Sequence, residues 1–162
     1  MSHILDVKGL ACPLPVLRAR KAMRGVAPGG LLRVLATDPA AVAAMVADTV
    51  EALGGIHVLH NNAAMTGDIM MQDRDVISMD VDLWDKSMAV NLRGPMLCAK
   101  HAIPHMLKVG GGSVITTGST KALQGDIGQT AYGASKAGIN SLTRSMASAF
   151  GSSVRVNSIL AG

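Results

Sequence analysis

Hydrophobic residues along the chain follow two different spacings. Short runs in which apolar side chains are continuous or fall at every second position predict strands. Longer segments, in which apolar residues recur every three or four positions, predict helices with one buried face. Glycine, proline and polar residues separate the two kinds of segment. We expect strands at 3–9, 31–37, 56–64, 110–119 and 154–159, and helices at 13–26, 39–55, 83–108 and 130–150.

The regular alternation of strand and helix predicts the fold class. Strands joined through helices are typical of a parallel sheet with right-handed crossovers and helices on its faces. Asp38 followed by Pro39 marks a helix start, because aspartate can cap a helix and proline is tolerated in its first turn. We therefore expect residues 1–162 to form a single three-layer α/β domain with a parallel sheet of about five strands.

The composition agrees with a globular domain. With 162 residues, of which 49% are hydrophobic, the chain can bury a core of its own. It lacks a run of about 18 uncharged apolar residues, so we expect no membrane partner. Its first residues lack the pattern of a signal peptide, and we expect a cytoplasmic location. Cys12 and Cys98 show no pairing pattern, which favours free thiols.

Positive charge is concentrated near the start of the chain. Six of the fifteen Lys and Arg residues fall before residue 37, and only Asp6 opposes them there. Nucleic-acid binding usually needs aromatic residues beside such charges, but the chain has one Trp, one Tyr and one Phe. We interpret the basic segment as a solvated helix face and expect no nucleic-acid partner.

Two further patterns could indicate a metal, but both favour ordinary packing. His101 and His105 have ligand spacing on a helix, yet Pro104 intervenes and no third ligand is close in sequence. The eleven methionines include several between 65 and 79, and methionine more often fills irregular gaps in a core. We expect no metal site.

Tyr132 and Lys136 are four residues apart in a predicted helix and therefore share one face. A cation close to a phenol stabilises the phenolate and lowers its pKa from about 10. Such a tyrosine can act as a general acid or base near neutral pH. Ser119, thirteen residues upstream, ends a predicted strand and could reach the same crevice. The alternative is that this pair is ordinary helix surface.

Four motifs occur in order with this pair: "NNAA", "NLRG", a serine ahead of "YGASK", and "RVNSILAG". With these motifs, the chain from about 38 to 162 resembles the short-chain dehydrogenase/reductase family. The resemblance implies a Rossmann-like sheet and NAD(P)-dependent interconversion of a small alcohol and a ketone. It also implies an enzyme that acts on a small-molecule alcohol or carbonyl substrate.

The resemblance assigns catalytic roles to four residues. Tyr132 would donate or accept the proton, and Lys136 would lower the pKa of the phenol. Ser119 would polarise the substrate carbonyl, and Asn91 would position a water of the proton relay. Each residue alone has an ordinary structural interpretation, so the assignment depends on their joint occurrence.

The resemblance also implies a cofactor, either NAD or NADP. Tyr132 and Lys136 would hold the nicotinamide ribose, while Asn62, Ala63 and Ala64 would line the adenosine side of the cleft. The residue that normally selects NAD or NADP belongs to a segment without a counterpart in this sequence. The choice between the two cofactors therefore stays open.

One part of the family pattern is absent: the glycine-rich turn that binds the pyrophosphate through backbone N–H groups. The first turn, "GLACPLP", contains Pro13 and Pro15, which remove two N–H donors. Asp38 at the next helix start would repel a phosphate. The chain stops at Gly162, before the usual substrate-covering segment, and Ala161 replaces a usual proline. We therefore expect impaired activity and weak or no NAD(P) binding.

Residues 3–41 resemble the first half of a TusA/SirA-type sulfur carrier, on the CPxP motif Cys12-Pro13-Leu14-Pro15. The resemblance implies a persulfide on Cys12, and a thiolate at a helix N-terminus is stabilised by the helix dipole. The chain would then join a TusA-like strand-helix-strand at 1–41 to a dehydrogenase-like core at 42–162. A sulfur carrier and a catalytically silent hybrid are the alternative functions, and a buried core cysteine is the ordinary interpretation of Cys12.

The predicted helix that contains Asn91 carries an apolar stripe, "MAVNLRGPMLCAKHAIPHML". This stripe resembles the helix through which such dehydrogenases dimerise. We therefore expect a homo-oligomer that associates through this helix.

Overall fold

The computed structural model describes residues 2–6, 31–35, 38–66 and 71–162. The chain divides into two compact units, residues 1–55 and 56–162, and each is described by itself. In the first unit, β1 (Ser2–Asp6) pairs in parallel with β2 (Leu31–Leu35). The helix predicted at 13–26 and the Cys12 motif lie outside the described residues.

The first unit also contains α2 (Pro39–Leu53), which begins where the sequence predicts. Asp38 has an extended backbone, and its carboxylate accepts a 2.8 Å hydrogen bond from the N–H of Ala41. Gly54 ends the helix in the left-handed conformation at φ 77°, and its N–H donates to Val50 O. An aspartate cap and a glycine C-cap therefore set the limits of α2.

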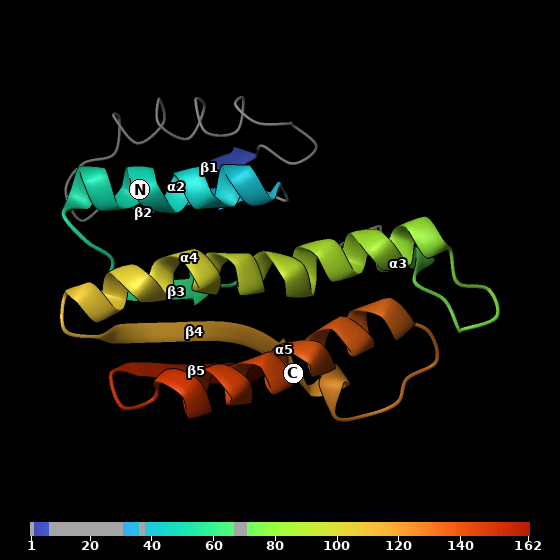
Figure 1. Cartoon of the computed structure of the whole chain (residues 1–162). Helices are drawn as coiled ribbons and strands as arrows, with labels where there is room; N and C mark the ends of the chain where they lie inside the picture. The colour runs from blue at the N-terminus through green and yellow to red at the C-terminus, as the bar shows by residue number, and fades with distance from the viewer. Residues whose placement is uncertain (1, 7–30, 36–37, 67–70) are drawn as a thin grey trace. The chain divides into compact units, whose positions relative to one another are not determined.

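The second unit is built on a parallel sheet with the strand order β3-β4-β5 (Figure 1). Its strands are β3 (Val58–Asn61), β4 (Gly112–Ser119) and β5 (Val154–Ala161). In the register, Val58 lies opposite Ser113, and Ser119 lies opposite Ala161. The predicted parallel, Rossmann-like pairing is confirmed, while a sheet of about five strands is not, because the five described strands form a two-stranded and a three-stranded sheet.

Three helical segments follow one another as a continuous rod beside α5 in Figure 1. They are α3 (Val81–Met88), the π-helical turn η2 (Ala89–Arg93) and α4 (Gly94–Lys108). In the π turn the N–H of Gly94 donates to Ala89 O, five residues earlier. The sequence predicted one helix at 83–108; a periodicity of apolar residues does not reveal the extra residue of the π turn.

The remaining elements of the second unit are the 3₁₀ turn η3 (Thr120–Ala122) and α5 (Thr130–Phe150). α4 and α5 pack on one face of the sheet, because their buried side chains form a single cluster with those of β4 and β5. The cluster contains Ala99, Ala102, Ile103, Met106, Val114, Met146, Val154 and Val156. On β5, buried Val154 and Val156 alternate with exposed Arg155 and Asn157, as expected for a strand with one covered face.

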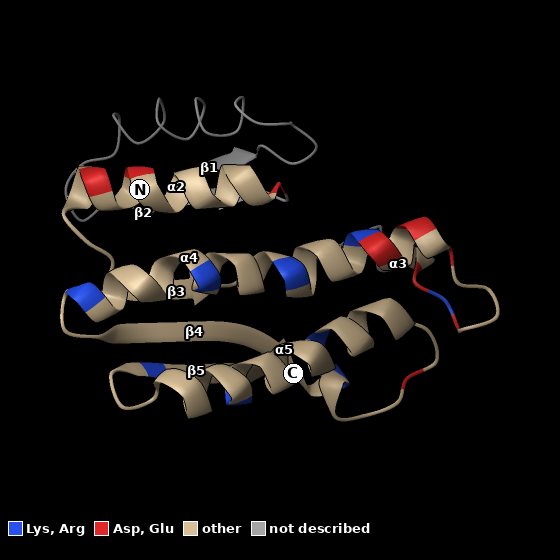
Figure 2. Ribbon diagram, in the orientation of Figure 1, with Lys and Arg blue, Asp and Glu red and all other residues tan. Residues whose placement is uncertain are grey.

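The charged residues of η2 and α4 lie on the exposed side of the rod (Figure 2). Arg93, Lys100 and Lys108 are exposed, whereas Leu97 and Met106 on the same rod are buried. Within the described ranges, no helix is both long enough and apolar enough to cross a lipid bilayer.

Candidate active site

The carboxyl ends of β3 and β4 lie at the same edge of the sheet, because the two strands are parallel. β3 ends at Asn61, just before Asn62, and β4 ends at Ser119. The loops that follow these strands are where ligand sites form in open α/β sheets. The residues predicted for the active site lie near this edge or on the helices beside it.

Lys136 is the most buried charged residue of the site, with 2% of its surface exposed. Its amine donates a 2.7 Å hydrogen bond to the backbone carbonyl of Thr117 on β4. The same nitrogen lies 5.6 Å from the centroid of the Tyr132 ring, within the range of a cation–π contact. Burial lowers the pKa of Lys136 from its usual value of 10.5. The structure therefore brings the tyrosine and the lysine together on one face of α5.

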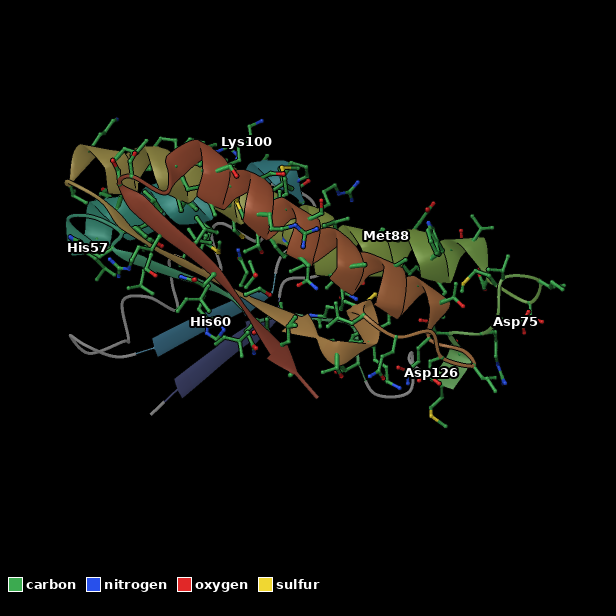
Figure 3. The ribbon with its side chains drawn as sticks, turned by 90° about the horizontal axis from the view of Figure 1, so that it is seen from below. His57, His60, Asp75, Met88, Lys100 and Asp126 are labelled. Atoms are coloured by element: carbon green, nitrogen blue, oxygen red, sulfur yellow. The ribbon has the colours of Figure 1, made fainter. Side chains whose placement is uncertain are left out.

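Ser119 ends β4 with an extended backbone and is 6% exposed. Its Oγ accepts a 3.2 Å hydrogen bond from the N–H of Lys121 and so caps η3. A hydroxyl that accepts in this way still has its proton to donate. Lys121 in η3 forms an ion pair with Asp126 in the loop that follows, and Asp126 is labelled in Figure 3.

Asn91 lies in the π turn and is 1% exposed. Its Oδ1 accepts a 2.7 Å hydrogen bond from the N–H of Met65, in the segment after β3. Its Nδ2 donates over 3.0 Å to Ser135 Oγ, which donates over 2.7 Å to the carbonyl of Tyr132. Asn91 thus links three segments and reaches the backbone of the tyrosine through Ser135, a residue that sequence reasoning missed.

The "NNAA" motif lies directly after β3. Asn62 is exposed and its Oδ1 accepts a 2.8 Å hydrogen bond from Thr117 Oγ1, while Ala63 and Ala64 are half-buried. His60, labelled in Figure 3, lies 3.1 Å from the same hydroxyl through Nε2. Because the hydroxyl hydrogen is directed at Asn62, the imidazole is the donor to Thr117. Thr117, which sequence reasoning also missed, therefore contacts Asn62 with its side chain and Lys136 with its backbone.

Asp73 is a third missed residue, and it is only 5% exposed. Its Oδ1 accepts a 3.0 Å hydrogen bond from the N–H of Ala131, and its Oδ2 accepts one of 2.8 Å from the N–H of Tyr132. Its carbonyl accepts a 2.9 Å bond from the N–H of Gln129. The sequence gives only an indirect signal for this contact: no Asp, Asn or Ser directly precedes α5, so its cap must come from another segment.

The described residues do not contain a pyrophosphate site at a helix start. Each of the three described helices that begin after a loop has its N-terminus capped by an aspartate: α2 by Asp38, α3 by Asp80 and α5 by Asp73. A carboxylate at this position occupies the N–H groups that a phosphate would bind and repels its charge. Of the residues predicted to hold the nicotinamide ribose, Tyr132 and Lys136 lie together on α5. Within the same residues, no three His, Cys, Asp or Glu side chains are grouped for a metal.

The sequence and the fold are similar to those of known proteins. A family model described as enoyl-(acyl carrier protein) reductase matches residues 18–162. A short-chain dehydrogenase/reductase of Hericium erinaceus is 41% identical over 145 residues, which are 88% of this chain and 53% of that protein. A crystal structure assigned as a short-chain alcohol dehydrogenase of Sinorhizobium meliloti superimposes with a TM-score of 0.72 at 28% identity. The superposition covers 96% of this chain and 60% of the dehydrogenase chain.

The chain spans less than half the length of some relatives. A protein of Bradyrhizobium diazoefficiens assigned as a short-chain type dehydrogenase/reductase is 38% identical over 126 residues, which are 77% of this chain but 44% of that protein. The family match also includes part of the segment 3–41, and these matches do not show a sulfur-carrier unit there. The extent of the family match and the identity to these relatives show that the chain belongs to the short-chain dehydrogenase/reductase family.

Proposed function

We propose that this chain carries the proton-transfer centre of an NAD(P)-dependent oxidoreductase that interconverts a small alcohol and a ketone. The contact between the buried amine of Lys136 and the ring of Tyr132 is the observation that supports it best. A structural lysine is usually exposed, whereas this one is held against a phenol by a strand carbonyl. Perturbed, buried titratable groups of this kind cluster at functional sites.

Each predicted residue has a chemical part in this proposal. Ser119 would donate its hydroxyl proton to the substrate oxygen and so polarise the carbonyl. Tyr132 would give its phenolic proton to that oxygen during reduction and take it back during oxidation. The ammonium of Lys136 would stabilise the phenolate that remains. The nicotinamide, when bound, supplies the hydride in this family.

Asn91 has a role here that differs from the one expected from the resemblance alone. Both ends of its amide are hydrogen-bonded to protein groups, Met65 and Ser135. We infer that its side chain holds the backbone of Tyr132 in place, through Ser135. Positioning of a relay water by Asn91 stays a prediction.

A direct experiment measures carbonyl reduction by the unmodified full chain and by the variant Tyr132→Phe, each with NADH and with NADPH. We expect Tyr132→Phe to lower the rate by roughly 10²–10⁴-fold, because it removes the proton donor. Ser141→Ala is the matched control, since Ser141 is an exposed hydroxyl on the same helix. A Tyr132→Phe chain as active as the control contradicts the proposal.

We also propose that NAD(P) binds this chain weakly, because aspartates close the described helix starts and Pro13 and Pro15 remove two further donors. The preference between NAD and NADP is not part of the proposal. Calorimetric titration with NADH and with NADPH tests the proposed weak binding, and we expect neither cofactor to saturate the chain in the micromolar range. Micromolar affinity for either cofactor contradicts the proposed impairment.

A sulfur carrier that acts through Cys12 is the second candidate, and the CPxP motif favours it. Cys12 lies outside the described residues, but the other cysteine offers an internal control. Burial raises the pKa of Cys98 to about 11, which keeps this thiol protonated and unreactive. After incubation with a cysteine desulfurase and cysteine, we expect a persulfide in Cys98→Ser but not in Cys12→Ser. Absence of a persulfide from both variants rejects this candidate.

We further propose that two copies associate through the helix that contains Asn91. A groove beside this helix is lined by Asp85, Met88, Ala89, Leu92, Arg93, Met96 and Leu142. Asp85 and Arg93 are two turns apart on one helix, so antiparallel pairing of two copies would bring each acid opposite an arginine. Met88, between the two charges, and Met96, just beyond Arg93, would supply the adaptable apolar contact.

A further inference from the structure

We propose that Asp73 is a positioning residue for Tyr132, and that it acts by capping the N-terminus of α5 from a distant segment. The inference rests on the proposed function of Tyr132 for its catalytic meaning. Its structural content can be tested without any cofactor or substrate. The argument starts from the missing cap of α5.

The first N–H groups of a helix lack partners within the helix, and a side chain just before the helix normally accepts from them. Gln129 occupies that position in α5. Its backbone is left-handed at φ 57°, and its side chain makes no capping bond. The N–H groups of Ala131 and Tyr132 are the donors left without a local acceptor.

Asp73 supplies both acceptors, one with each carboxylate oxygen, from 58 and 59 residues earlier in the chain. Hydrogen bonds to an ionised carboxylate are stronger than those between neutral groups. The negative charge also lies at the positive end of the helix dipole. Asp73 is 5% exposed, so water competes poorly for these donors.

The backbone around the cap fixes the same turn. The carbonyl of Asp73 accepts from the N–H of Gln129 over 2.9 Å. Gly128 is left-handed at φ 84°, and a Cβ at this position would lie 3.1 Å from that carbonyl. The segment that contains Asp73 therefore contacts the chain from Gly128 to Tyr132 through backbone and side chain together.

Tyr132 and Lys136 have separate anchors as a result. Lys136 is bound to β4 through Thr117, one helical turn beyond the cap. Tyr132 lies in the first turn, whose free N–H groups depend on Asp73. Loss of the cap should release the first turn while the rest of α5 stays packed, because helix ends fray before their interiors. The tyrosine would then leave its place against the lysine in a protein that remains folded.

The chain offers a matched control and two single-residue probes. Asp80 caps α3 with the same chemistry, since its carboxylate accepts from the N–H groups of Asp82 and Leu83. Tyr132 is the only tyrosine, and Trp84, in the first turn of α3, is the only tryptophan. NMR of chains labelled on the tyrosine and tryptophan rings therefore reports each capped turn separately.

We expect Asp73→Ala to shift or broaden the Tyr132 ring signal and to speed amide exchange at Ala131 and Tyr132 by roughly tenfold. The Trp84 signal should stay in place. Asp80→Ala should give the reverse pattern, with Trp84 altered and Tyr132 unchanged. A folded Asp73→Ala chain whose Tyr132 signal and amide exchange match those of the unmodified chain overturns the proposal.

Asp73→Asn decides the case if Asp73→Ala does not fold. The asparagine keeps the shape and one acceptor oxygen, so we expect it to restore part of the Tyr132 signal and to slow exchange at one of the two amides. An asparagine chain indistinguishable from the unmodified protein at both amides also overturns the proposal. Because all these readouts are recorded without NAD(P), failure of the oxidoreductase activity would leave the positioning result intact.

Discussion

The amine of Lys136 donates a 2.7 Å hydrogen bond to the carbonyl oxygen of Thr117, so a helix and the central strand of the sheet are joined by a buried charge. Burial of this amine is unfavourable, and it lowers the pKa of the group. Stability alone does not account for a lysine at this position. Under the proposed function, the contact with Tyr132 accounts for it.

Replacement of the lysine should separate stability from function. We expect Lys136→Met to leave the free energy of unfolding unchanged or to raise it by about 1 kcal/mol, because a flexible apolar side chain replaces a buried charge. Carbonyl reduction should fall to the level of Tyr132→Phe. Urea unfolding measures the first effect and a kinetic assay the second; a strongly destabilised Lys136→Met would show that the amine has a structural role.

The network around Asn91 should be sensitive to loss of its central member. Asn91→Ala leaves the N–H of Met65 without its acceptor and removes the donor to Ser135 Oγ, which still donates to the carbonyl of Tyr132. We expect it to lower the free energy of unfolding by about 2–4 kcal/mol, since each buried unsatisfied group costs about 1–3 kcal/mol. Ser135→Ala removes the hydrogen bonds to Asn91 Nδ2 and to the carbonyl of Tyr132 but keeps the bond between Asn91 and Met65, and it should cost less because a helix carbonyl also accepts a backbone bond. Equal losses in the two variants would mean that the bond to Met65 contributes little.

Cys98 should make stability depend on pH in the alkaline range. Burial raises the pKa of its thiol from 9.0 to about 11, so the folded chain holds the proton more tightly than the unfolded chain does. This contribution is fully present below pH 9.0 and is lost as the pH rises towards 11. Its upper limit is on the order of 3 kcal/mol, the free energy of a two-unit difference in pKa.

The measurement compares urea midpoints of the unmodified chain and Cys98→Ala between pH 8 and pH 11. We expect a smaller decline with pH in Cys98→Ala, because Lys136 and the other titrating groups are common to both chains. Parallel declines would contradict burial of the thiol as the cause.

The proposed association of two copies can be tested by exchange of charges. Arg93→Asp should weaken the dimer, because an acid would then lie opposite Asp85 of the second copy. The double variant Asp85→Arg with Arg93→Asp should restore it. Light scattering after size-exclusion chromatography measures the mass of the particle. If Arg93→Asp and Asp85→Arg, each alone, leave this mass unchanged, the pairing is excluded.

Two adjacent glycines should respond differently to the same change. Both have a positive φ, but a Cβ on Gly110 would meet nothing within 4 Å, whereas one on Gly111 would lie 2.4 Å from Ser153 O. We expect Gly110→Ala to cost about 1–2 kcal/mol of unfolding free energy from backbone strain alone. Gly111→Ala should cost about 1–3 kcal/mol more, because the new methyl meets rigid backbone. Similar urea midpoints for the two variants would contradict the close approach at Ser153.

Local patterns in the sequence were sufficient where the physics is local. Asp38 and Pro39 marked the start of α2, and the four-residue spacing of Tyr132 and Lys136 put them on one helix face. The parallel pairing followed from the alternation of strands and helices. In the first two cases the interacting residues are close together in the chain, whereas the strand pairing follows from the order of the elements.

Contacts between distant segments could not be predicted in this way. Asp73 caps a helix that begins more than fifty residues later, and nothing near Asp73 in the sequence indicates the partner. The bond between Asn91 and Ser135 likewise depends on how two helices pack. The number of strands in one sheet is also a property of the assembled chain, and the roles of the site residues remain predictions that need the experiments above.

The π turn at Ala89–Arg93 has a consequence for insertions and deletions. Removal of one residue that restored ordinary α geometry would rotate α3 by about 100° relative to α4. Leu83 and Ser87 are buried in this structure, with 7% and 3% of their surface exposed, and the rotation would turn both side chains towards solvent. The number of residues between α3 and α4 is therefore constrained by the burial of these two side chains.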